Sequence, residues 1–167
     1  MDRISGFEPL AAQGARMLVL GSMPSVASLE KHQYYGKPQN AFWKVMGELF
    51  AAGPELPYDE RVLKLTQSGV AVWDVLASCV RPGSLDSAID MTSVKVNAFI
   101  PLLRRHDGIE RIYFNGRKAE AIFRRHALAG VHADFPDIEL HVLPSTSSAM
   151  ATLNFAAKLE RWRVLSG

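Results

Sequence analysis

The sequence predicts a layered α/β fold with a central, mainly parallel sheet. Strand-like and helix-like segments alternate along the 167 residues. The first two strand segments, residues 16–21 and 69–74, are almost continuous apolar runs, as expected of strands that are covered on both faces. In such sheets, ligands bind outside the carboxyl ends of the strands. We therefore expect a functional site in the segments that follow these ends.

Two helices and a loop are predicted around these first two strands. Apolar side chains recur at helical spacing from Asn40, a good helix-capping residue, until Gly53-Pro54 ends the pattern. Residues 59–67 predict a second, shorter helix just before the strand over residues 69–74. The segment Arg81-Pro-Gly-Ser84 predicts a loop.

The second half of the chain continues the alternation. Asn97 predicts the cap of a third helix, and residues 109–114 predict a third strand. Asn115-Gly116 then turns the chain into a further helix, and residues 138–143 predict the fourth strand. The loop Pro144–Ser148 leads to a final helix. That helix has three apolar residues at helical spacing, Phe155, Leu159 and Trp162.

Composition limits the class of protein. A hydrophobic content of 48% in 167 residues suits a single domain spanning residues 1–167, with no repeat or linker. The apolar runs are too short to cross a bilayer, and the first residues show no apolar stretch that resembles a signal peptide, so we expect none. One cysteine, Cys79, excludes an internal disulfide and a four-cysteine metal cluster within this chain. The five histidines show no metal-ligand spacing. We expect a cytoplasmic protein without metal or cofactor.

The charge pattern permits nucleic acid as a partner without requiring it. The formal net charge is +2, and most arginines fall on predicted helices. Such arginines are usually solvated, so the distribution of positive charge over the faces of the molecule decides what they do.

The clearest candidate for a site lies after the first strand. There, Gly21-Ser-Met-Pro-Ser25 predicts a sharp turn that exposes backbone N–H groups. Further along, Tyr34 and Tyr35 lie in a Gly/Pro-containing loop just before Asn40. Taken alone, these residues fit two interpretations: a binding surface, or aromatic residues covering a loop beside a helix cap.

In sequence, this arrangement resembles the uracil-DNA glycosylase superfamily, in particular the mismatch-specific uracil/thymine-DNA glycosylases. Four ordered blocks carry the resemblance: the Gly21–Ser25 turn with Tyr34–Trp43, Gly69–Ser78, Phe114–Ala119 and Leu143–Ser147. Within the superfamily, the chain is most similar to the DNA-deoxyinosine (hypoxanthine-DNA) glycosylases. The resemblance implies a three-layer α/β/α fold around a four-stranded sheet. It also implies a monomeric enzyme whose partner is DNA containing a deaminated base.

Two departures from the superfamily pattern bear on the substrate. Most members have Asp or Asn at the third position of the Gly-x-x-Pro turn, where it positions the attacking water. Here that residue is Met23, so the resemblance to the hypoxanthine family assigns the water to Asn40. Leu143 stands where many uracil-excising members have a histidine that stabilises the departing base, which argues against efficient uracil excision.

The resemblance assigns roles to the other residues that follow the first two strands. Tyr35 aligns with an aromatic residue that stacks on the extruded base, and Ser22 and Met23 would line the base pocket. Asp74, at the end of the second strand, would accept a hydrogen bond from N1–H of hypoxanthine, or donate to O6 if its pKa is raised. The alternative for Asp74 is a helix- or loop-capping role.

The segment after the fourth strand is expected to contact DNA. The resemblance implies that Pro144, Ser145, Thr146 and Ser147 hold the DNA backbone, a contact that positions the DNA without reading its sequence. Met150 would fill the stack vacated by the base, although inward packing of this methionine fits the sequence as well.

The chemistry expected is hydrolysis of an N-glycosidic bond. No lysine is convincingly placed as an amine nucleophile, so we expect a monofunctional enzyme that leaves an abasic site. Three alternatives remain: a uracil- or thymine-mismatch glycosylase, an inactive DNA-binding module of the same fold, and an unrelated α/β protein that binds a small ligand.

Overall fold

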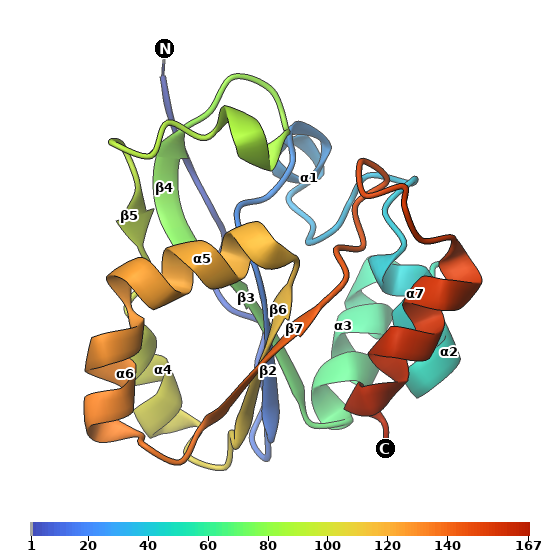
Figure 1. Cartoon of the computed structure of the whole chain (residues 1–167). Helices are drawn as coiled ribbons and strands as arrows, with labels where there is room; N and C mark the ends of the chain where they lie inside the picture. The colour runs from blue at the N-terminus through green and yellow to red at the C-terminus, as the bar shows by residue number, and fades with distance from the viewer. Residues whose placement is uncertain (1) are drawn as a thin grey trace.

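The computed structural model describes residues 2–167 and is built around a four-stranded parallel sheet (Figure 1). The sheet order is β3-β2-β6-β7, and each of its three strand pairs is parallel. The strands are β2 (Met17–Gly21), β3 (Val70–Asp74), β6 (Arg111–Asn115) and β7 (Glu139–Leu143). Every residue of β2 and β3 is buried, as their continuous apolar runs predicted.

Helices cover both faces of this sheet. On one side lie α2 (Phe42–Phe50), α3 (Tyr58–Gln67) and α7 (Phe155–Trp162), which ends in a short 3-10 turn, η2 (Arg163–Leu165). On the other side lie α4 (Phe99–Arg105), α5 (Arg117–His126) and α6 (Leu128–Asp134). The predicted three-layer α/β/α fold with a mainly parallel four-stranded sheet is therefore confirmed. Within residues 2–167, no helix is long and apolar enough to cross a membrane.

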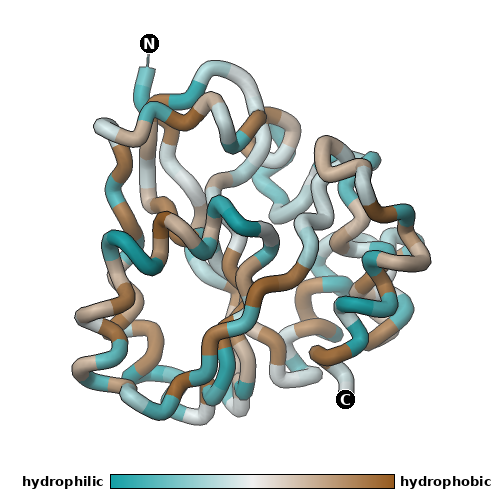
Figure 2. Tube along the Cα trace, in the orientation of Figure 1, coloured by the Kyte–Doolittle hydropathy of each residue, from teal (hydrophilic) through white to brown (hydrophobic). Residues whose placement is uncertain are grey.

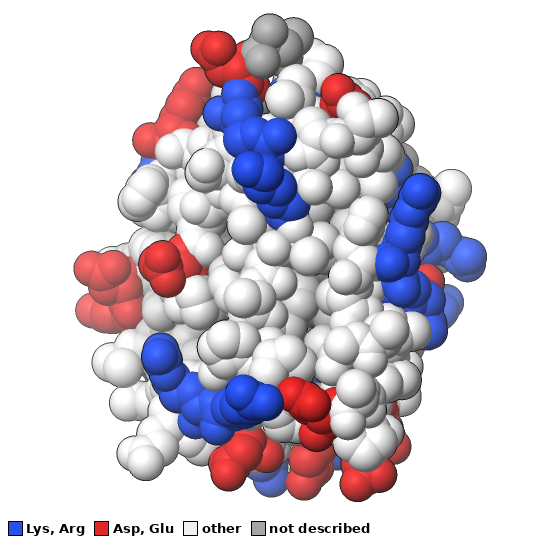
Figure 3. Space-filling model, turned by 90° about the vertical axis from the view of Figure 1, so that its left-hand side faces the viewer, with Lys and Arg blue, Asp and Glu red and all other residues white. Residues whose placement is uncertain are grey.

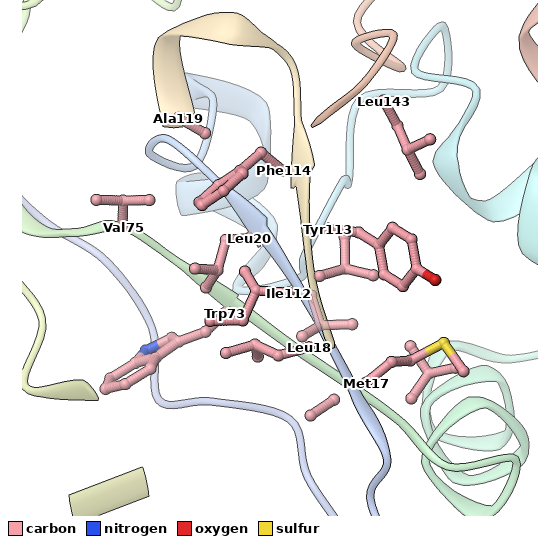
Figure 4. Packing of buried hydrophobic residues seen from close by; sticks show 14 of the residues in the cluster. Met17, Leu18, Leu20, Trp73, Val75, Ile112, Tyr113, Phe114, Ala119 and Leu143 are labelled. Carbon is pink, nitrogen blue, oxygen red and sulfur yellow. The ribbon is translucent and has the colours of Figure 1, made fainter. Parts of the chain in front are cut away.

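The core forms on the two faces of the sheet because successive strand residues point in opposite directions. Leu18, Leu20 and Phe114 lie on one side, whereas Met17 and Tyr113 lie on the other (Figure 4). Hydrophobic residues concentrate in the strands and on the inner turns of the helices, and the loops beyond the strand ends are mostly pale or teal (Figure 2). The packed core thus supports a rim of polar loops at the carboxyl ends of the strands.

A second, antiparallel sheet was not predicted. It has the order β1-β4-β5 and consists of β1 (Arg3–Ser5), β4 (Leu76–Val80) and β5 (Lys95–Val96). Two short elements near the strand ends were also missed, α1 (Val26–Lys31) and the 3-10 turn η1 (Asp86–Ala88). Elements of two to six residues carry little periodicity, and their pairing depends on distant parts of the chain.

The predicted caps of two helices need correction. Asn97 does not cap α4: the residue at that position is Ala98, and the Asn97 side chain instead donates to the backbone oxygen of Asp74 at 2.8 Å. Asn40 lies one residue before Ala41, the N-cap of α2, but its Oδ1 still accepts from the Phe42 N–H at 2.9 Å. An asparagine side chain can accept from a helix N–H as a cap or donate to a backbone oxygen, so the sequence alone did not distinguish these two roles.

The positive charge is dispersed over the face formed by β5, α4 and α6. Figure 3 shows separate groups of Lys and Arg there, with acidic residues between them. Arg104 of α4 forms an exposed ion pair with Asp134 of α6, and within the neighbouring helix α5 Arg124 pairs with Glu120. Such pairs contribute little to stability, and this face resembles the solvated surface expected of helical arginines.

Candidate active site at the strand ends

A cavity of about 430 Å³ opens at the carboxyl ends of β2, β3 and β6, where the fold class predicts a ligand. Its walls come from the turn after β2, the loop before α2, the η1 segment and the segment after β7. Most of the residues predicted for the site line this one cavity: Ser22, Met23, Tyr35, Asn40, Asp74, Ser145, Thr146, Ser147 and Met150. The structure thus brings together segments that are far apart in the sequence.

Gly21 permits the closest approach in this cavity. It is the last residue of β2 and pairs with Asp74, the last residue of β3. A Cβ atom on Gly21 would lie 2.6 Å from Asp74 Oδ1 and 2.9 Å from the Tyr35 hydroxyl oxygen. Only a residue without a side chain leaves room for both groups at this point of the cavity floor.

Asp74 is a buried carboxyl group without a partner. It is 4% exposed, and no hydrogen bond from residues 2–167 reaches its buried Oδ2. Burial raises its pKa to about 7, the nearby carboxylate of Asp86 adds to this effect, and Arg81 opposes it. No backbone N–H within the described chain donates to this carboxyl group, so a capping role has no support.

Asp86 and Arg81 belong to this environment and were missed from the sequence. The Ser22 hydroxyl donates to Asp86 Oδ1 at 2.5 Å, which links the turn after β2 to η1. Arg81 is buried and donates to the backbone oxygens of Gly83 and Pro24, both at 2.7 Å. Arg81 lies in the predicted loop over residues 81–84, and a charged residue there gave no sign that it would be buried.

Tyr35 has an unusual backbone conformation. Its φ is 53°, in the left-handed region that few non-glycine residues adopt. The ring stacks on Phe42 with centroids 4.0 Å apart, so one ring face is covered and only the other remains for a ligand. The hydroxyl is buried without a hydrogen-bond partner in residues 2–167. Burial and the nearby Asp74 carboxylate raise its pKa far above the usual value, against a smaller lowering effect of the Asn115 amide, so the phenol stays protonated.

Asn40 lines the cavity while it also contacts its own helix. The hydrogen bond from the Phe42 N–H uses one lone pair of Oδ1 and fixes the orientation of the amide. The second lone pair of Oδ1 and the Nδ2 donors remain available for groups in the cavity. The amide is therefore held in one position without being fully occupied.

The segment after β7 is anchored from several sides. The Thr146 N–H donates to Asn115 Oδ1, and Asn115 Nδ2 donates to the Thr146 hydroxyl oxygen, each at 2.9 Å. The Ala41 N–H donates to the backbone oxygen of Thr146. From α7, Trp162 donates to the Pro144 oxygen at 2.9 Å, and Lys158 donates to the Ser147 oxygen at 3.1 Å. These contacts hold the loop rigidly beside the cavity.

This anchoring corrects part of the predicted DNA-contacting loop. Thr146 is 1% exposed and its hydroxyl is bonded to Asn115, so it supports the loop instead of presenting a group to DNA. Pro144 does not line the cavity, and its backbone oxygen accepts the hydrogen bond from Trp162 of α7. Ser145, Ser147 and Met150 remain at the cavity wall. Among the described residues, no cluster of three or more His, Cys, Asp or Glu side chains is arranged to hold a metal ion.

Comparison with known proteins agrees with this geometry. The family model described as "Uracil DNA glycosylase superfamily" matches residues 9–166. The chain belongs to the uracil-DNA glycosylase superfamily. Within it, the chain is 34% identical over 145 residues to a hypoxanthine DNA glycosylase of Methanosarcina acetivorans, covering 86% of each chain. It is also 32% identical over 115 residues to a hypoxanthine DNA glycosylase of Methanosarcina barkeri, covering 68% of this chain and 72% of the relative.

The fold agrees with the same superfamily. A solution structure from Methanosarcina acetivorans, described as that of a candidate uracil DNA glycosylase, superposes with a TM-score of 0.78 at 30% identity, covering 99% of this chain and 100% of that one. The two departures from the superfamily pattern have clear positions here. Met23 lines the cavity with a thioether, and Leu143 is buried and lies outside the cavity wall. Neither side chain polarises water or stabilises a departing anion.

Proposed function

We propose that this superfamily member is a monofunctional DNA glycosylase that removes a flipped deaminated base, preferentially hypoxanthine from deoxyinosine. The observation that carries the proposal is the cavity itself. Its floor holds the unpartnered Asp74 carboxyl group, one wall presents the free face of Tyr35, and Asn40 lies at another wall. The names of the two Methanosarcina relatives support the choice of hypoxanthine.

Base extrusion is the first step, because the glycosidic bond is out of reach inside a duplex. Flipping costs a few kcal/mol, and least for a damaged or mismatched base. The free face of Tyr35 stacks on the extruded base, an interaction that contributes about 1–3 kcal/mol and tolerates many bases. Phe42 supports the opposite face of the ring and prevents it from tilting away.

Bond cleavage then needs one water molecule. The C1′–N bond breaks with its electron pair moving to the base, and positive charge develops on the sugar. Asn40 Oδ1 accepts a hydrogen bond from the water that adds to C1′, and the proton lost from this water neutralises the departing base. An amide is a weak base, so departure of the base runs ahead of water attack. The products are free hypoxanthine and an abasic site.

Asp74 selects the base in this proposal. Although its pKa is raised to about 7, the ionised carboxylate is the reactive form in this proposal: it accepts a hydrogen bond from N1–H of hypoxanthine, a bond strengthened by charge and by the buried surroundings. The protonated acid, which the raised pKa favours below pH 7, donates to O6 instead and supports slower excision. Ser145 and Ser147 contact the DNA backbone from the anchored loop. Met150 fills the vacated stack, consistent with its partial exposure at the rim.

The proposal includes hydrolysis without a covalent enzyme–DNA adduct. Lys158 is not among the residues that line the cavity; it is buried, and its ammonium group donates to the backbone oxygen of Ser147. Lys37 lines the cavity from an exposed position. Borohydride treatment during turnover should therefore trap no covalent DNA complex, and a trapped complex would contradict this part of the proposal.

The test of the whole proposal is a substrate panel. Oligonucleotides that carry deoxyinosine, uracil or thymine opposite each normal base are incubated with the protein, and abasic sites are then cleaved with alkali. We expect the fastest cleavage at deoxyinosine. Faster cleavage at uracil or at mismatched thymine would favour a mismatch glycosylase, and cleavage of none would favour an inactive DNA-binding module.

A substitution at Gly21 tests the cavity floor. In Gly21→Ala, the new Cβ displaces the Asp74 carboxyl group and the Tyr35 hydroxyl. We expect a loss of about 1–3 kcal/mol in the free energy of unfolding from overpacking. Affinity for deoxyinosine DNA should fall by about tenfold or more, as expected when polar contacts worth about 1.4 kcal/mol are lost. Urea unfolding and fluorescence anisotropy measure the two effects.

The matched control for this change is Gly130→Ala in α6, where nothing lies within 4 Å of the added Cβ. Because alanine favours the helix by about 0.5–1 kcal/mol, this variant should be slightly more stable and should bind DNA as the wild type does. Equal DNA affinity of the two variants would contradict a ligand at the cavity floor.

A further inference from the structure

We infer that the hydroxyl of Tyr35, as well as its ring, contacts the extruded base: it donates a hydrogen bond to the base carbonyl oxygen next to the N–H that Asp74 accepts. Tyr35 is then a specificity-determining residue, and the two residues together recognise a lactam edge, an N–H beside a C=O. The inference rests on the proposed function and adds to Asp74 a second side chain that recognises the edge of the base.

The first observation is a pair of orphaned polar atoms. Within residues 2–167, three buried side-chain nitrogen or oxygen atoms lack a hydrogen-bond partner: the Tyr35 hydroxyl, Asp74 Oδ2 and one terminal nitrogen of Arg81. The first two belong to residues of the cavity wall, whereas Arg81 is not part of it. Native proteins rarely leave such atoms unsatisfied, so two of them at one cavity floor indicate a polar ligand.

The second observation is that these two groups face the same small space. Asp74 Oδ1 and the Tyr35 hydroxyl oxygen both lie within 3 Å of the point where a Gly21 Cβ would stand. No hydrogen bond joins the two residues. Asn115 binds Thr146 through its oxygen and one of its two Nδ2 hydrogens, and its amide also lies near the Tyr35 oxygen, where it lowers the pKa of the phenol. A donor from Asn115 to this oxygen leaves the hydroxyl hydrogen of Tyr35 free. The hydroxyl and the carboxyl group are thus both free to bind a ligand at this point.

The third observation is that packing does not require the hydroxyl. The ring of Tyr35 stacks on Phe42, which a phenylalanine at position 35 would do equally well. The left-handed backbone of Tyr35 is a costly conformation for an aromatic residue, and such conformations concentrate at functional sites. Here it coexists with a hydroxyl that is buried at the cavity floor without any internal partner.

The chemistry of the two groups specifies the ligand edge. The phenol stays a donor at neutral pH, and the ionised carboxylate is an acceptor only. Together they match N1–H and O6 of hypoxanthine, which lie side by side. Adenine presents an acceptor at N1 and a donor at N6, so it places a lone pair against the carboxylate and leaves the phenol without an acceptor. The pair therefore discriminates deoxyinosine from its parent nucleotide.

The test compares two bases with Tyr35→Phe. Anisotropy measures the affinity of wild type and variant for non-cleavable 2′-fluoro oligonucleotides that carry either hypoxanthine or unsubstituted purine, which lacks both O6 and N1–H. We expect the substitution to weaken hypoxanthine binding about tenfold more than purine binding, the usual effect of leaving one buried acceptor unpaired. Because both ligands are titrated into the same preparation, partial unfolding cancels in the ratio.

The control is Tyr34→Phe, which removes a hydroxyl that is already bonded to the Glu8 backbone oxygen at 2.7 Å. This change should affect both ligands by the same factor. Equal factors for Tyr35→Phe as well would overturn the inference, since they would indicate a structural role. If wild type excises deoxyinosine while this ratio is unchanged, only the inference fails. If wild type excises no deaminated base, the proposed function fails instead.

Discussion

Replacing Asn40 by alanine is expected to slow single-turnover excision of deoxyinosine by about 10²–10³-fold, the usual cost of losing one group that positions or stabilises the reacting atoms. No other residue takes over, because Met23, at the position where most superfamily members carry an amide or carboxyl group, has only a thioether in the cavity. Affinity for the non-cleavable hypoxanthine oligonucleotide should change much less than the rate, since we propose that Tyr35 and Asp74, and not Asn40, bind the base.

Asn40 also stabilises the start of α2, so the effect on rate must be separated from an effect on folding. Loss of the hydrogen bond to the Phe42 N–H costs about 0.5–2 kcal/mol of stability. Asn154→Ala is the matched control: the Asn154 side chain caps α7 by accepting from the Ala157 N–H at 2.9 Å and lies outside the cavity wall. This control should lose similar stability and keep its rate within about threefold, below the effect of one strong contact. A rate for Asn40→Ala as high as that of the control would remove Asn40 from catalysis.

The central sheet was predictable because its signal is local. A run such as Met17–Gly21 is buried on both faces, so its own composition reveals it. The antiparallel sheet is different, because Arg3–Ser5 is too short to show a pattern and pairs with a strand 75 residues further along. Its existence depends on long-range pairing that no window of sequence contains.

The site was predictable to the same extent. Tyr35, Asn40 and Asp74 follow strand ends or match family motifs, and the structure places all three around one cavity. Asp86 and Arg81 were not predictable, because their significance comes from contacts with Ser22 and Pro24 across 64 and 57 residues. The hydrogen bonds of Thr146 were not predictable for a related reason: its partner, Asn115, lies 31 residues earlier in the chain.

Asp74→Asn is expected to abolish a pH dependence of activity. In the proposed mechanism, the ionised carboxylate of the wild type accepts from N1–H, whereas the protonated acid donates to O6 and supports slower excision. Excision of deoxyinosine should therefore rise with pH through the Asp74 pKa of about 7. The amide in the variant does not titrate, so this inflection disappears. The rate above pH 7.5 should fall by about 10–100-fold, since a hydrogen bond to a charged group contributes about 1.5–3 kcal/mol. Single-turnover rates between pH 5.5 and 8.5 test this, and an unchanged inflection in the variant would exclude Asp74 as its source.

The same substitution, which should lower activity, should raise the free energy of unfolding at alkaline pH. The folded-state pKa of Asp74, about 7, lies above the ordinary value of 3.8, so the carboxyl group is tolerated in the fold when protonated and disfavoured when ionised. Its contribution to stability is therefore complete below about pH 4 and is lost as pH rises through 7. Between pH 5 and 8, this loss amounts to about 2–3 kcal/mol in the free energy of unfolding, at about 1.4 kcal/mol per pKa unit.

Urea unfolding at pH 5 and pH 8 isolates this effect, because the rest of the chain is the same in wild type and variant and its contribution cancels in the difference. Asp134→Asn, which removes an exposed partner of Arg104, is the control and should keep the wild-type slope. Asp74→Asn should be the more stable protein at pH 8 and the less active one. Parallel slopes for wild type and Asp74→Asn would mean that the carboxylate is already stabilised in the folded state. A buried charge that weakens the fold at neutral pH, yet is needed for the rate, is best explained by a base that supplies the missing N–H.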